Sequence, residues 1–127
     1  MIIAKHTAEL CPGGMIKPDK ELISRVFNEV GFEERIVGYR ISEHLGPVKT
    51  SMYGFEEVVH FLNDPFPQLE FEELEKWIRV VMKDKELALK ITKVVEEETN
   101  DYDRTERIRR LMEERLSQCK NLALVST

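Results

Sequence analysis

The spacing of apolar residues after about residue 72 most strongly constrains what this chain can fold into. From Leu74 onward, apolar residues recur every three or four positions in three successive runs. That spacing gathers apolar side chains on one side of an α-helix. Asp84 suits the N-cap of the second helix, and Asn100 begins a polar break before the third. The pattern predicts helices over about 72–83, 85–99 and 103–120.

The chain before residue 72 has a different character, because it holds the five prolines and most of the glycines. Short runs with the period of a strand alternate there with short helical runs. Val37, Tyr39 and Ile41 alternate with polar residues, and a turn at Gly46-Pro47 follows them. The patterns predict, in order, a strand at 2–6, a helix at 19–30, strands at 35–43 and 48–52, a helix at 55–63 and a strand at 67–71.

Composition narrows the class of protein. With 127 residues, 42% of them hydrophobic, the chain is long enough for one domain with its own core. A net charge of −5 argues against nucleic acid, because binding to phosphates depends on Lys and Arg. No apolar run approaches the roughly 20 residues of a membrane span, so we expect a cytoplasmic protein with no membrane partner. Two cysteines and three scattered histidines predict no metal site, and the sequence identifies no cofactor.

One N-terminal cluster carries residues suited to catalysis. His6, Glu9 and Cys11 follow a short apolar run and precede a Pro-Gly-Gly turn. A histidine can transfer protons, or as a cation can lower the pKa of a nearby thiol. The cluster is therefore a candidate catalytic site. The alternative is structural, with His6 at the surface of a strand, Glu9 in solvent and Cys11 as a small buried group.

The order strand, helix, strand, strand, helix, strand is the split βαβ pattern of ferredoxin-like domains. The segment from Lys5 to Pro12, followed by Pro18-Asp19, resembles the opening of small uncharacterised members of the dimeric α+β barrel group. The resemblance covers residues 1–71 and leaves 72–127 as a helical extension. It implies an antiparallel sheet with two helices on one face, and a homo-oligomer in which open sheet faces pack together.

A second candidate site lies on the predicted central hairpin. Tyr39, Arg40, His44 and Tyr53 lie on or beside its strands. An open sheet face with aromatic walls and a few polar groups can hold a small organic ligand. The alternative is that these aromatic residues only pack against their neighbours, as aromatic residues in strands usually do.

Two charged patterns suggest other chemistry. Acidic groups at 72–75 and 98–101 could hold Mg²⁺ between antiparallel helices, as in all-α nucleotide pyrophosphohydrolases, although acidic residues at helix ends are also ordinary. The third helix carries five arginines interleaved with acids, and residues four apart predict the pairs Asp103–Arg107, Glu106–Arg110, Arg109–Glu113 and Arg110–Glu114. Such a face is typical of a solvated helix rather than of a phosphate-binding surface.

The sequence thus predicts an α+β protein with a ferredoxin-like part at 1–71 and a helical extension of about three helices at 72–127. The functional hypothesis is a small-molecule-binding protein with its site near His6 and Cys11, with catalysis left open. The alternative hypothesis is a non-enzymatic interaction or oligomerisation module that acts through the C-terminal helices.

Overall fold

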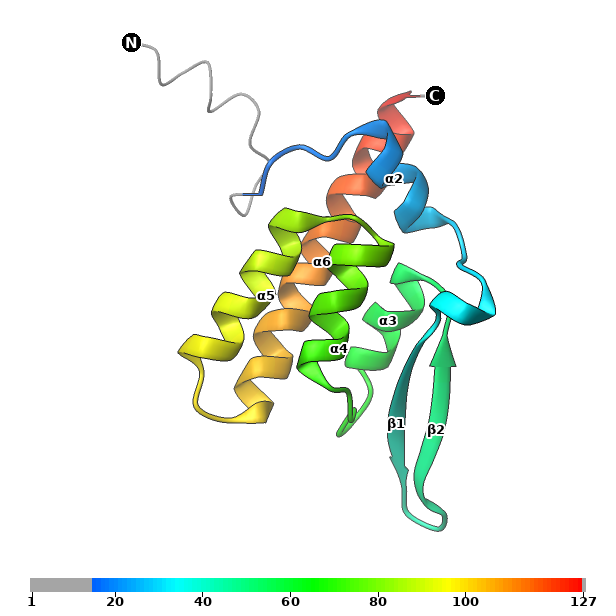
Figure 1. The fold of residues 1–127 in the computed structure, drawn as a ribbon, viewed down its shortest axis with the longest axis vertical. Helices are drawn as coiled ribbons and strands as arrows, with labels where there is room; N and C mark the ends of the chain where they lie inside the picture. Colours follow the sequence, from blue (N-terminus) through cyan, green and yellow to red (C-terminus); the bar gives the residue numbers. More distant parts are fainter. Residues whose placement is uncertain (1–14, 127) are drawn as a thin grey trace.

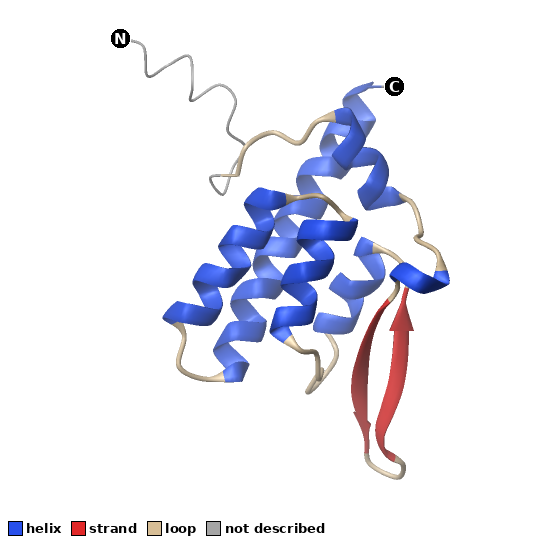
Figure 2. Cartoon of the chain, in the orientation of Figure 1, coloured by secondary structure: helices blue, strands red, loops and turns tan. Residues whose placement is uncertain are grey.

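The computed structural model describes residues 15–126, and side chains up to residue 124, as an α+β arrangement (Figure 1). Helices lie side by side in a bundle, and a two-stranded hairpin extends from one flank of it (Figure 2). None of the helices in this part of the chain has both the length and the apolar content to cross a membrane. The elements are α2 Lys20–Phe27, η1 Phe32–Glu34, β1 Ile36–Ser42, β2 Gly46–Met52, α3 Phe55–Leu62, α4 Phe71–Lys76, η2 Trp77–Val81, α5 Lys85–Glu97 and α6 Asp101–Ser126.

The three predicted C-terminal helices are confirmed. The first consists of α4 followed by the π-helical turn η2, in which the Met82 backbone N–H reaches the Trp77 carbonyl at 3.1 Å. Asp84 caps α5 as expected, since its carboxylate accepts from the Leu87 backbone N–H at 3.1 Å. The third helix, α6, begins at Asp101 and runs to Ser126, beyond the predicted end at residue 120.

The core forms where the apolar sides of α3, α4, α5 and α6 meet. Its members come from both predicted parts of the chain, and α2 and α3 both contact α6 across the expected boundary at residue 71. Fully burying one such side chain contributes about 1.5–3 kcal/mol, so this layer supplies most of the driving force for folding. Side chains with no exposed area include Phe55, Phe61, Leu74, Ile78, Leu87, Ile91, Ile108 and Met112.

The predicted central hairpin is also confirmed. Its strands pair antiparallel from Ile36 with Met52 to Ser42 with Gly46, and Gly46 has a φ of 69° that favours glycine. Gly38 faces α3, where an added Cβ would lie 2.7 Å from Cζ of Phe61. The lack of a side chain at Gly38 therefore lets the strand lie directly on the Phe61 ring.

The ferredoxin-like sheet is not confirmed. Within residues 15–126 the sheet has two strands. The expected strand at 67–71 is reduced to one bridge between Gln68 and Tyr39, and α4 already begins at Phe71. Phe66 has a φ of 53°, outside the range of a strand, and Pro67 has no N–H for a ladder. The expected first strand at 2–6 lies outside the described residues.

The first described helix is shorter than predicted. α2 ends at Phe27 rather than near residue 30, because the Asn28 backbone is extended, with φ −106° and ψ 150°. The chain then runs beside the end of β2, where the Val30 N–H donates to the Tyr53 carbonyl at 2.7 Å. This contact occupies the edge of β2 at its end nearest the bundle.

Candidate functional site

The predicted catalytic cluster lies outside the part of the chain that the structure describes. His6, Glu9 and Cys11 all precede residue 15. A small-molecule site at these three residues therefore stays a prediction.

The structure does not bring the four predicted ligand contacts together. Tyr39 and Arg40 are adjacent in β1 and so point to opposite faces of the hairpin. Arg40 lies on the α3 side, where its Nε approaches Oδ2 of Asp64 at 2.6 Å. His44 lies in the turn at the tip, and Tyr53 follows β2 at the other end, about 20 Å along a strand of this length. Tyr39 lies on the strand face away from the bundle and is 44% exposed.

Within residues 15–126, no other element covers the face of the hairpin that carries Tyr39. Residues directly opposite one another in an antiparallel pair share a face, so the register assigns every residue of this side. Tyr39 is 44% exposed and Ile41 is 48% exposed, whereas Ile36 and Met52 on the other side are buried against the bundle. This side, which we call the outer face, consists of Val37, Tyr39 and Ile41 from β1 and Pro47, Lys49 and Ser51 from β2.

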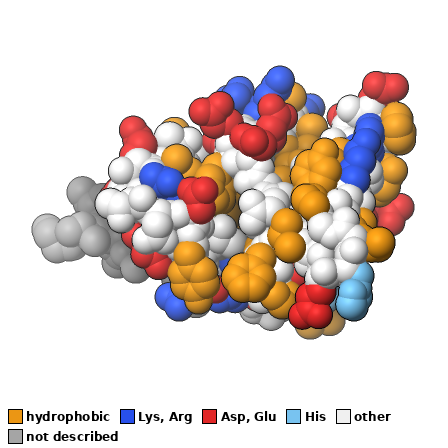
Figure 3. Space-filling model, turned by 90° about the horizontal axis from the view of Figure 1, so that it is seen from below, with side chains coloured by type: hydrophobic (Ala, Val, Ile, Leu, Met, Phe, Trp, Pro, Cys, Tyr) orange, Lys and Arg blue, Asp and Glu red, His pale blue; other side chains and the backbone are white. Residues whose placement is uncertain are grey.

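Two further exposed apolar residues border the outer face. Leu45, 78% exposed, lies at the tip of the hairpin, and Phe66, 74% exposed, lies in the loop that leads to Gln68. Figure 3 views the end of the molecule toward which the hairpin points, and hydrophobic side chains lie among charged ones over this end. Phe66 also has a positive φ, which in a bulky residue costs about 1–3 kcal/mol. The fold thus holds a strained aromatic residue where it is accessible.

A shallow groove of about 240 Å³ runs along the inner border of the outer face. The Tyr39 N–H and carbonyl bond the Gln68 backbone at 2.8 and 2.9 Å, which fixes one wall. The lining combines four apolar or aromatic residues with one amide and two carboxylates. It consists of Val37, Tyr39, Gln68, Leu69, Glu70, Phe71 and Asp101.

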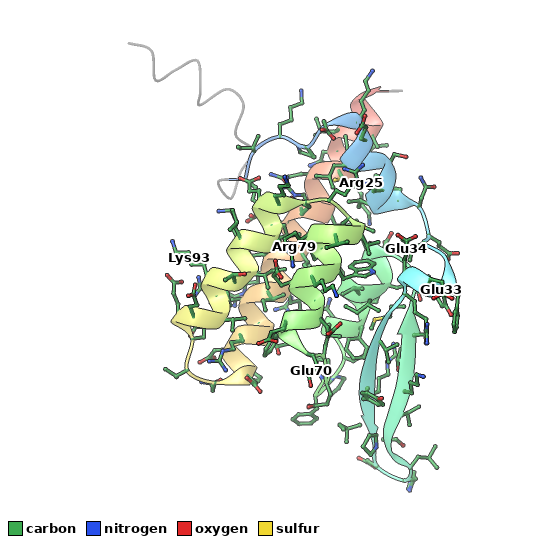
Figure 4. All side chains as sticks on the ribbon, in the orientation of Figure 1. Arg25, Glu33, Glu34, Glu70, Arg79 and Lys93 are labelled. Carbon is green, nitrogen blue, oxygen red and sulfur yellow. The ribbon has the colours of Figure 1, made fainter. Side chains whose placement is uncertain are left out.

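Few charged residues surround the outer face, and they differ in whether they form ion pairs. Asp101 is paired with Arg104 at 2.8 Å. Lys49, directly opposite Tyr39, and Glu70, at the start of α4, take part in none of the salt bridges within residues 15–126. Figure 4 shows Glu70 on the side of β1 away from β2. The outer face therefore has one cation along one border and one carboxylate along the other.

Each of the two acidic patterns is partly engaged in ion pairs. Glu75 binds Arg79 at 2.8 Å, and Glu98 binds Arg107 at 2.9 Å. Within residues 15–126, no group of three or more His, Cys, Asp or Glu side chains is placed to hold a metal ion.

The arginines of α6 are paired along most of the exposed side of the helix. The expected pairs of Arg109 with Glu113, at 2.8 Å, and of Arg110 with Glu106, at 3.9 Å, are present. Arg107 was expected to pair with Asp103 and instead reaches back to Glu97 and Glu98 at the end of α5. Hydrogen bonds to Glu98 and Glu97 raise the pKa of Arg107, and a hydrogen bond from Arg109 lowers the pKa of Glu106.

A buried charge cluster that the sequence analysis did not identify lies at the other end of the bundle. Arg115 bonds both oxygens of Asp84 and one oxygen of Glu86, and it also donates to the Ile16 carbonyl at 2.9 Å. The one available signal was the position of Arg115, three residues after Met112 on the buried stripe of α6. Because the carboxylate oxygens of Asp84 and Glu86 have partners from the protein itself, the cluster anchors the start of α5 and the chain at Ile16 to α6.

Comparisons with known protein families, with characterised proteins and with solved structures found no match. The function therefore has to be inferred from the geometry of the described residues, among which the outer face is the most distinctive accessible feature.

Proposed function

We propose that this protein is a non-enzymatic protein-interaction module, and that its docking surface is the outer face of the hairpin with Leu45 and Phe66 beside it. One observation carries the proposal. Tyr39 and Ile41 are about half exposed on a sheet face that nothing in residues 15–126 covers, while the opposite face is buried at its bundle end by Ile36 and Met52. Contiguous exposed apolar surface with a polar border is typical of protein-binding sites.

The helices are less suited to this role than the sequence suggested. The periodic apolar residues of α4, α5 and α6, such as Leu74, Ile91 and Met112, have no exposed area because they form the core. The exposed apolar residues of these helices, such as Leu89, are isolated from one another in sequence, and single exposed residues of this kind are ordinary. The apolar surface available to a partner is therefore concentrated on the hairpin.

The face of the hairpin, rather than its edge, is the docking surface. Since the Tyr39 N–H and carbonyl both bond Gln68, the opposed residue Lys49 directs its own backbone groups to the outer edge of β2. Pro47 and Ser51, two residues before and after Lys49, face the same outer edge of β2. A proline and a lysine at outward positions are devices that hinder the addition of another strand.

The proposal can be tested by photocrosslinking in cells that make the protein. Tyr39→p-benzoylphenylalanine places a photoreactive group on the outer face, and the same replacement at Leu89, 71% exposed on α5, is the matched control. We expect a discrete adduct with a second polypeptide from position 39 and not from position 89. Mass spectrometry then identifies the second polypeptide.

A second substitution makes this test specific. Ile41→Ser removes apolar area from the outer face and should reduce the adduct at position 39, because Ile41 is the next residue on that side of β1. Equal adduct yields at positions 39 and 89 would contradict the proposal. So would an adduct yield at position 39 that Ile41→Ser leaves unchanged.

A further inference from the structure

We infer that the partner of the outer face is a second copy of this chain, docked face to face, with Lys49 of each copy against Glu70 of the other. The inference rests on the proposed function, since it assigns an occupant to the same surface. It follows from the order of charged and apolar groups across the hairpin.

The two borders of the outer face carry opposite charges. Lys49 lies on β2, Tyr39 lies opposite it on β1, and Gln68 bonds the far side of Tyr39. Glu70 follows Gln68 on that same far side and lines the groove beside Tyr39. Neighbouring strands lie about 4.8 Å apart, so the positive and negative borders are separated by about 10 Å of apolar surface.

Two copies of such a face are complementary in only one of two simple orientations. A two-fold axis that runs parallel to the strands turns one copy over, so the positive border of each copy meets the negative border of the other. A two-fold axis across the strands would set Lys49 against Lys49 instead. Closed two-fold symmetry is the commonest arrangement of homo-oligomers, and each contact in it occurs twice. The parallel axis therefore brings the Lys49 border of each copy onto the Glu70 border of the other around an apolar centre, with the two residues offset by about two positions along the strands.

The neighbouring charges support a second copy as the occupant. Arg40 is adjacent to Tyr39 in β1, and Asp101 lines the groove beside Tyr39. Both already have partners, because Arg40 pairs with Asp64 and Asp101 pairs with Arg104. Lys49 and Glu70 have opposite signs, lie on the two borders of the face and are both exposed. The face thus carries the complement of its own charge pattern.

The same orientation gives Phe66 a contact. Phe66 lies two residues before Gln68, on the same border of the face as Glu70. When the face is turned over about the parallel axis, the Glu70 border of one copy meets the β2 border of the other. The exposed Phe66 ring of each copy then lies toward the β2 border of the second copy, and aromatic residues of this kind are enriched at interface cores.

Charge reversal tests the inference through sedimentation velocity of the purified full chain over a range of concentrations. We expect the wild type to dimerise, and Lys49→Glu and Glu70→Lys each to weaken the dimer about tenfold or more, because each single variant sets like charges together. The double variant should regain the dimer. An equimolar mixture of the two single variants should form a heterodimer, since both cross-pairs are then opposite in sign.

Matched controls reverse the same charges elsewhere on the surface. Lys93→Glu on α5 and Glu33→Lys in η1 change net charge by the same amounts as the two test variants, and both residues are exposed and lie away from Glu70 (Figure 4). These controls should dimerise like the wild type. Thermal unfolding followed by circular dichroism checks that all variants are folded.

The outcomes separate this inference from the proposed function. A wild type that stays monomeric at its highest soluble concentration would overturn the second copy as partner, and so would a dimer that Lys49→Glu and Glu70→Lys weaken no more than the controls do. An adduct from position 39 with a different protein would then leave the proposed function intact. The absence of any such adduct would remove both.

Discussion

Arg115 and Asp84, 31 residues apart in sequence, form a buried pair in which Nε and Nη2 of the arginine donate to the two carboxylate oxygens at 2.8 and 3.2 Å. The two side chains are 2% and 3% exposed. Asp84 also caps α5, so a single carboxylate joins the start of one helix to the middle of another. A charge buried in this way is stabilising only while its partners are present.

Arg115→Ala should lower the free energy of unfolding by about 3–5 kcal/mol, because it leaves the Asp84 carboxylate buried without its cation. Urea unfolding followed by circular dichroism measures the loss. Arg110→Ala on the exposed side of the same helix is the control and should change stability by less than about 0.5 kcal/mol. A loss for Arg115→Ala as small as that of the control would mean that the pair contributes nothing to stability.

Gly38→Ala should destabilise the protein by about 1–3 kcal/mol, because the new Cβ would lie 2.7 Å from the Phe61 ring and force a shift in a packed region. Gly31→Ala is a matched control, since no atom lies within 4 Å of a Cβ there. Combining Gly38→Ala with Phe61→Leu should cost less than the sum of the two single changes. Additive costs in that double-mutant cycle would show that the ring is not what excludes a side chain at residue 38.

Phe66→Gly should leave the protein as stable as the wild type or raise its stability by up to about 1 kcal/mol, because glycine relieves the positive φ and the lost side chain is mostly exposed. The same variant should reduce the adduct formed from position 39. Lys83→Gly, at the second non-glycine residue with positive φ among residues 15–126, should share the effect on stability but not the effect on the adduct. Unfolding free energies and adduct yields of the two variants check both halves. A clear loss of stability in Phe66→Gly would show that its ring packs in the fold.

Glu106 should titrate below the usual range of a glutamate, because the hydrogen bond from Arg109 stabilises its charged form. A folded-state pKa below the unfolded value adds stability that is present above the unfolded pKa and is lost as pH falls through the folded pKa. NMR titration of the Glu106 carboxyl should show its midpoint rising toward the ordinary value in Arg109→Gln. Lys93→Gln should leave the midpoint unchanged, and an equal rise in both variants would contradict a specific effect of Arg109.

Local patterns predicted the elements whose stability is decided locally. The helix around Ile91 and the hairpin around Tyr39 have a clear period and recognisable ends, such as the cap at Asp84 and the glycine at residue 46. The strand predicted at 67–71 does not form, because the backbone at Phe66 leaves the extended range. A phenylalanine gives no indication in the sequence that its φ will be positive.

The candidate site was only partly predictable. The hairpin was identified, but Tyr39 and Arg40 were assigned to one ligand site although adjacent residues of a strand face opposite sides. Glu70 could not be connected with Tyr39 from the sequence, because the bridge at Gln68 brings distant segments together. The partners of Arg115 could not be predicted either, because they lie 31 and 99 residues away in sequence.

The bonds that Arg115 makes to Ile16 and Asp84 span 99 and 31 residues, so they tie the first described residues to the last helix. A chain is synthesised from its N-terminus, and long-range contacts form only after both segments exist. While the ribosome is still making α6, the carboxylates of Asp84 and Glu86 lack the cation that later holds them. The last described helix thus supplies the group that closes the fold, and a chain truncated before residue 115 would remain open at that end.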